Sequence, residues 1–144
     1  MRASHREIEK EFDRWLLGKV RRRRPGVLHG WNLHVRQTFQ GLKGEGWKLC
    51  LERSCPHNAV QDQLLKEEAA RLGLNYHSDA KTLGEAIEEL YLADIISVPS
   101  QYSARSYDDP DLVTKLRVNS LGCNYRLQVP FIRAQQPLLS LIHI

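Results

Sequence analysis

The chain has 144 residues, of which 42% are hydrophobic and 26% are charged, and its formal net charge is +4. This composition is typical of one globular domain, and no run of about 18 apolar residues predicts a transmembrane helix. The amino terminus lacks the apolar core of a signal peptide, so we expect a cytoplasmic location. Three cysteines argue against a disulfide framework, and Cys50, Cys55 and His57 fit no closed zinc pattern, so we expect no metal and no other cofactor.

The first segment predicts an amphipathic helix from about residue 4 to Arg23, which ends before Pro25 and Gly26. We expect its apolar stripe to pack on a sheet, because the residues repeat at helical spacing: Ile8, Phe12, Trp15 and Leu16. The arginine run at residues 21–24 is interpreted as a solvated helix end. Weak attraction to anionic lipid head groups is the second interpretation, and no nucleic-acid motif accompanies the run.

The middle of the chain alternates strands and helices. Residues 27–31 predict a short strand, and the spacing of Val35, Phe39 and Leu42 predicts a helix after it. Residues 47–52 alternate apolar and polar side chains, which favours a second strand. A helix is expected from near His57 to Gly73, with Glu68 on its apolar face, where a carboxylate needs a partner such as an arginine.

The next helix is expected to begin at a capping box formed by Thr82 and Glu85. Its inward side carries Leu83, Ile87 and Leu90, and its outward side carries Glu85, Glu88 and Glu89. Asp94 is expected to accept a hydrogen bond from nearby backbone at the turn that follows.

A buried strand is then predicted at residues 95–98 and ends at Pro99. Ser100 caps a short helix, and Asp109 with Pro110 begins another. Residues 115–120 predict a fourth strand, followed by a turn at residues 121–124. This order predicts an α/β fold: a Rossmann-like parallel sheet with helices on both faces.

Two domain segments are expected. Residues 1–129 form the α/β domain, and residues 130–144 form an interdomain linker with the truncated start of a second domain or an unrelated tail. The chain resembles a fragment truncated at both ends, because an independent doubly wound domain would not normally begin with a crossover helix.

Two strings resemble the GT-B-fold glycosyltransferases of family four: YLADIISVPSQY at residues 91–102 and KLRVNSLG at residues 115–122. PGVLHGW at residues 25–31 and QLLKEE at residues 63–68 are similar to further segments of that family. The resemblance implies the incomplete amino-terminal, acceptor-side domain of a retaining enzyme. Such an enzyme transfers a sugar from a nucleotide-sugar donor to a hydroxyl of a sugar or lipid-linked acceptor.

Polar residues follow three successive strands and should meet at the edge where ligands bind in parallel sheets. By the resemblance, His57 is the catalytic histidine of the cleft, near the donor sugar. Five residues would line the acceptor side: His29, Trp31, Arg53, Ser54 and Ser100. Gly122 and Asn124 would face the donor, although an aspartate is usual at the second position, and the family's glycine-rich loop is absent.

Two other functions stay open from the sequence. One is a non-catalytic α/β binding module that keeps the crevice without the chemistry. The other is a small interaction domain whose arginine run at residues 21–24 docks it to an acidic surface.

Overall fold

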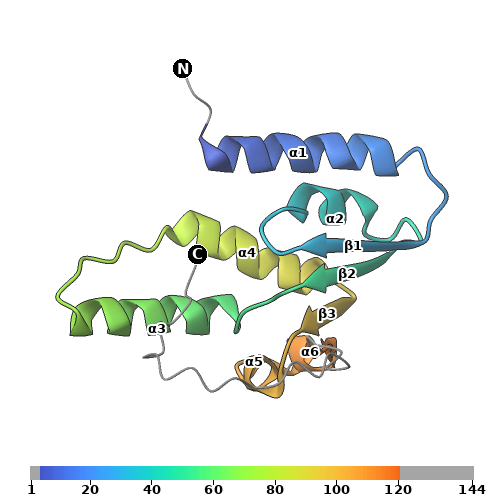
Figure 1. The fold of residues 1–144 in the computed structure, drawn as a ribbon. Helices are drawn as coiled ribbons and strands as arrows, with labels where there is room; N and C mark the ends of the chain where they lie inside the picture. Colours follow the sequence, from blue (N-terminus) through green and yellow to red (C-terminus); the bar gives the residue numbers. More distant parts are fainter. Residues whose placement is uncertain (1–3, 121–144) are drawn as a thin grey trace, which may run out of the picture.

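The structure is a computed structural model that describes residues 4–120 (Figure 1). The elements in chain order are α1 (His5–Val20), β1 (Val27–Trp31), α2 (Arg36–Leu42), β2 (Lys48–Glu52), α3 (Asn58–Arg71), α4 (Ala80–Leu92), β3 (Ile95–Val98), α5 (Gln101–Ala104), α6 (Pro110–Val113) and β4 (Leu116–Val118). The strands form one sheet in the order β1-β2-β3-β4, and each neighbouring pair is parallel. The predicted α/β class with a Rossmann-like parallel sheet is confirmed.

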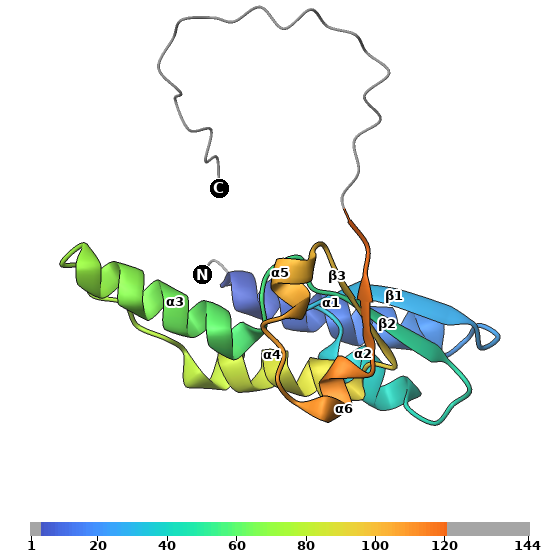
Figure 2. The same cartoon turned by 90° about the horizontal axis from the view of Figure 1, so that it is seen from below.

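One face of the sheet carries the core. Register places Leu28 beside Leu49 and Leu51 beside Ile96, and these side chains form an apolar row across the strands. Phe39 of α2 and Leu90 of α4 pack against this row, and both are fully buried. Figure 2 shows α2, α4 and α6 on one side of the sheet. The alternate residues, which point to the other face, include His29, Trp31, Cys50, Glu52 and Arg117.

The helix predicted from about residue 4 to Arg23 is present as α1, but it ends at Val20, and its predicted orientation is wrong. Ile8, Phe12 and Trp15 are 59%, 48% and 56% exposed, whereas Asp13 is only 4% exposed. Asp13 points inward because α2 has no side-chain cap of its own. Its carboxylate accepts hydrogen bonds from the backbone N–H of Gln37 at 2.6 Å and of Thr38 at 2.9 Å, which caps α2 from a neighbouring helix.

Two predictions for α4 are wrong. Glu89 was expected on the outward side, but it is 1% exposed and lies in the core. The helix also begins earlier than the predicted capping box: Asp79 is the N-cap, and its carboxylate accepts from the Lys81 N–H at 3.1 Å and from the Thr82 hydroxyl. Aspartate is a stronger N-cap than threonine, and the earlier start lets Thr82 add a second bond to it.

Other local predictions are confirmed. Ser100 and Asp109 cap α5 and α6, with Pro110 in the first turn of α6. Asp94 accepts from the Leu49 N–H at 2.8 Å, so its backbone partner belongs to the neighbouring strand β2. Glu68 has the arginine partner it was expected to need, since Arg71 donates to it at 2.6 and 2.8 Å.

The face of α3 that carries Glu68 is not buried, contrary to the prediction. Leu64, Leu65 and Leu72 are 43%, 44% and 54% exposed, and the pair formed by Glu68 and Arg71 is exposed as well. The inward side of α3 instead carries Asn58 and Asp62, which are 7% and 8% exposed.

Candidate functional site

The carboxyl ends of β2 and β3 bring two predicted site residues, His57 and Ser100, into one cluster. The His57 backbone N–H donates to the Ser106 hydroxyl oxygen at 2.7 Å, and this hydroxyl donates to the Ser103 carbonyl at 2.6 Å. The Ser100 hydroxyl oxygen accepts from the Ser103 N–H at 3.1 Å, which caps α5. The start of α3 is therefore tied to α5 at the edge where parallel sheets bind ligands.

His57 is the N-cap of α3, and this role selects its tautomer. Its Nδ1 accepts from the Ala59 N–H at 3.2 Å, so the neutral ring carries its proton on Nε2. The ring meets Tyr107 edge-on, with centroids 5.0 Å apart, and burial lowers the pKa of His57 below its usual range. Among residues 4–120, no hydrogen bond is made by Nε2. His57 can thus donate a hydrogen bond from Nε2 to a ligand oxygen.

Arg53 is buried and donates hydrogen bonds to the segment that follows β2. The residue is 8% exposed, and its Nε donates to the Pro56 carbonyl at 3.0 Å while Nη2 donates to the Gln61 side chain. Burial lowers its pKa. Ser54, next along the chain, is exposed. The Arg53 guanidinium therefore holds the loop in shape, and its two bonds leave it less available to a ligand than the sequence suggested.

The other two predicted residues, His29 and Trp31, form a second group on the exposed face of the sheet. The Nε2 of His29 lies 3.2 Å from the Glu52 carboxylate, and Trp31, which is 59% exposed, pairs in register with Glu52. His29 sits two residues before the end of β1, so it lies on the strand rather than at the edge. Gly122 and Asn124 lie outside the described residues.

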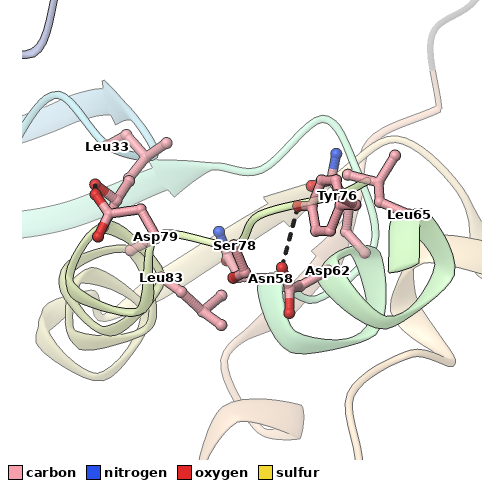
Figure 3. A pocket seen from close by; sticks show the side chains of 11 residues that line it. Leu33, Asn58, Asp62, Leu65, Tyr76, Ser78, Asp79 and Leu83 are labelled. Carbon is pink, nitrogen blue, oxygen red and sulfur yellow. Dashed lines mark hydrogen bonds between the residues drawn. The ribbon is translucent and has the colours of Figure 1, made fainter. Parts of the chain in front are cut away.

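Sequence reasoning missed a cavity of about 210 Å³ between α3 and α4, beyond the ends of β1 and β2. Figure 3 shows the hydrogen bond from the Tyr76 hydroxyl to Asp62, which is 3.1 Å long. Lys66 pairs with the same carboxylate at 2.6 Å. The cavity's lining includes Leu33, Asn58, Asp62, Tyr76, Ser78 and Asp79. The signal in the sequence was the helical spacing of Asn58, Asp62 and Leu65, which places two polar residues and one leucine on one side of α3.

A buried carboxylate fixes the loop that joins β1 to α2 and borders this cavity. Glu89 accepts from the Val35 N–H at 3.1 Å, from the Asn32 amide at 2.9 Å and from the Leu33 N–H. Leu33 has a φ of 79°, a left-handed conformation that a leucine rarely adopts. Asn58 donates to the Asn32 side-chain oxygen at 2.9 Å, which joins α3 to the same network.

The electrostatics of Glu89 reflect its burial. Burial raises its pKa to about 7, and the negative charge of Asp13 acts in the same direction, while the three N–H donors act against both. Arg6 and Lys10 of α1 pair with Glu85 rather than with Glu89. Glu89 has no cationic partner among the described residues, so its charge is balanced by backbone and amide dipoles.

No family model, curated protein or solved structure matches this chain. Within the described part of the chain, no three His, Cys, Asp or Glu side chains are grouped so that they could hold a metal ion.

Proposed function

We propose that the chain is the acceptor-side α/β domain of a retaining glycosyltransferase of the GT-B class. The observation that carries the proposal is the Nε2–H of His57, which makes no hydrogen bond within residues 4–120 and lies at the carboxyl edge of a parallel sheet. The sequence resemblance to family four supports it, because the resembling string at residues 91–102 contains β3 and Ser100, the N-cap of α5, which lie at this same edge.

In this proposal His57 acts as a hydrogen-bond donor. A neutral imidazole with its proton on Nε2 stabilises a ligand oxygen without accepting a proton from it. The reaction forms a bond between the acceptor oxygen and the anomeric carbon and breaks the bond from that carbon to the nucleotide phosphate. The acceptor hydroxyl gives its proton to a phosphate oxygen of the departing nucleotide.

The acceptor would bind on the surfaces that present hydroxyl-binding groups beside apolar ones. Trp31 offers an exposed ring for stacking on a sugar, and Glu52, its neighbour in register, offers a carboxylate that accepts from sugar hydroxyls. Ser54 follows β2 and Ser100 follows β3, at the carboxyl ends of the strands. Gly122 and Asn124 would face the donor, as the resemblance implies.

Catalysis requires donor and acceptor to be held together, and the family holds the donor chiefly with a second domain. We therefore expect this chain to bind sugars without turning over nucleotide-sugars. The test is a titration of ¹⁵N-labelled protein with neutral glycans and with nucleotide-sugars, followed by NMR. We expect shifts at Trp31, Glu52 and His57, with affinities of about 1 mM, the range of a partial site.

The variants His57→Ala and His77→Ala provide a matched pair. His77 is an exposed histidine in the connection between α3 and α4 and lies outside both groups of site residues. Only His57→Ala should weaken the nucleotide-sugar response. Uniformly unshifted spectra with every sugar and nucleotide-sugar would refute the proposal.

A non-catalytic binding module is the second candidate, and the commitments of Arg53 and Ser100 favour it. Arg53 donates to the loop after β2, and Ser100 caps α5. Because both side chains already make structural hydrogen bonds, neither is available to take part in a reaction. The same titration separates the two functions. Binding of neutral glycans with no response of His57 to nucleotide-sugars would favour the binding module.

A further inference from the structure

The outer side of α1 carries an apolar line that continues into cations. Ile8, Phe12 and Trp15 are followed along the same side by Lys19, since the spacing of four, three and four residues keeps one side of a helix. Arg22 lies in the turn just after α1. The rings of Phe12 and Trp15 lie 5.8 Å apart, and the Lys19 ammonium lies 5.7 Å from the centroid of the Trp15 ring. Figure 1 shows α1 along the upper edge of the molecule, with no described element above it.

The inner side of α1 is already occupied, so the outward line does not result from a loosely placed helix. Asp13 caps α2 through two backbone N–H groups, and its carboxylate also accepts from the Thr38 hydroxyl at 2.6 Å. Leu17 packs so closely on Gly41 that a Cβ there would lie 2.8 Å from a leucine methyl. These contacts hold the rotation of the helix and leave Ile8, Phe12 and Trp15 facing away from the domain.

We propose that the outer side of α1 docks on an anionic lipid surface, with the helix lying in the plane of the head groups. Apolar residues beside lysines and arginines on one helix face are the signature of an interfacial helix. The charges fit an acidic surface: Glu11 is paired with Arg14, while Lys19, Arg22 and the rest of the run at residues 21–24 add positive charge at one end. This inference does not depend on the sugar chemistry proposed above.

A second copy of the chain fits this surface less well. Three half-exposed side chains offer on the order of 300 Å² of contact, since a large aromatic side chain covers roughly 200 Å² when fully buried. A stable protein interface buries about 800 Å² on each partner. Pairing two copies would also bring their cations toward each other, whereas a lipid surface of opposite charge attracts them.

The membrane contact would be peripheral. No helix in the described ranges is both long and apolar enough to cross a bilayer. A line of three apolar residues instead reaches only the boundary between head groups and acyl chains.

The experiment is sedimentation of the full chain with vesicles of phosphatidylcholine, alone or with about one-third phosphatidylserine. We expect binding to the mixed vesicles that weakens as salt is raised, because salt screens the arginines. Phe12→Ser with Trp15→Ser should lower the partition constant about tenfold or more. The double variant Arg22→Ser with Arg23→Ser should lower the partition constant about fivefold for each arginine replaced.

Two exposed residues elsewhere provide controls for these variants. Tyr102 is 67% exposed on α5, and Arg105 is exposed at the end of the same helix. Tyr102→Ser and Arg105→Ser should leave the partition constant unchanged. Circular dichroism should show all variants folded, because none of the replaced side chains is buried.

Two outcomes would overturn the proposal. One is the absence of binding to the anionic vesicles at low salt by the folded wild-type chain. The other is a concentration-dependent dimer, seen by light scattering, that Phe12→Ser with Trp15→Ser abolishes, because this would assign the surface to a second copy.

Discussion

Glu89 makes a sharp prediction about how stability depends on pH. Its carboxylate is 1% exposed, and burial raises its pKa to about 7 from the 4.5 expected in the unfolded chain. The folded state therefore holds its proton at pH values where the unfolded state has released it. Its contribution to stability is fully present below pH 4.5 and is lost as the pH rises through 7.

The magnitude follows from the two pKa values. Integrating the difference in bound protons between pH 5 and pH 8 gives a loss of about 2–3 kcal/mol in the free energy of unfolding. Glu89→Gln keeps the shape of the side chain and removes the titration. The difference in the free energy of unfolding between wild type and Glu89→Gln should therefore change by about 2–3 kcal/mol over this range, to the disadvantage of wild type at pH 8.

The assay is urea unfolding of both proteins at pH 5 and pH 8, followed by far-ultraviolet circular dichroism. The comparison between proteins cancels His57, whose lowered pKa has the opposite sign: its contribution is present above pH 6.5 and is lost at lower pH. An equal change with pH in the two proteins would refute the argument, because it would show that Glu89 does not titrate in this range.

Four further predictions follow from individual contacts. Gly30→Ala should lower the free energy of unfolding by about 1–3 kcal/mol, because its Cβ would lie 2.5 and 2.9 Å from the Val35 methyls. Gly18→Ala, with no atom within 4 Å of the new Cβ, should raise it by up to about 1 kcal/mol in the same urea assay, and a loss there would contradict the helix packing. Asp13→Ala should lower the free energy of unfolding by about 2–3 kcal/mol, because it removes the cap of α2. The control Glu11→Ser, at an exposed residue of the same helix, should lower it little in parallel unfolding experiments. The ¹⁵N shifts of His57 should show the proton on Nε2 and a pKa below 6.5, and a protonated Nδ1 in the neutral ring would exclude its capping bond.

The strands and the caps of α5 and α6 could be predicted because each depends on residues close in sequence. The β-branched run of β3 ends at Pro99, which cannot donate to a ladder, and Ser100 directly caps the next helix. The meeting of His57 and Ser100 was predictable for a similar reason, whereas His29 and Trp31 lie in a separate group. Parallel strands deliver the residues after them to one edge, so His57 and Ser100 meet through Ser106 and Ser103.

Periodicity could not show which partner a polar side chain on a helix would find. Glu89 lies among glutamates on α4 and resembles its half-buried neighbour Glu88 in every local respect. Its burial depends on three donors from residues 32–35, more than 50 positions earlier in the chain. The cavity was missed for the same reason, since Leu33 and Asp79 meet across it from distant segments.

The capping of α2 explains both why α1 was predicted the wrong way round and why its apolar line is exposed. Helix α2 has seven residues and no cap of its own, so its first N–H groups need acceptors from elsewhere. Asp13 supplies them and must face inward. At about 100° per residue, Trp15 then lies roughly 200° from Asp13, on the opposite side of α1. A capping bond inside the domain thereby presents Trp15 to whatever lies outside it, and for this reason Asp13→Ala should loosen both α2 and the surface that we propose docks on lipid.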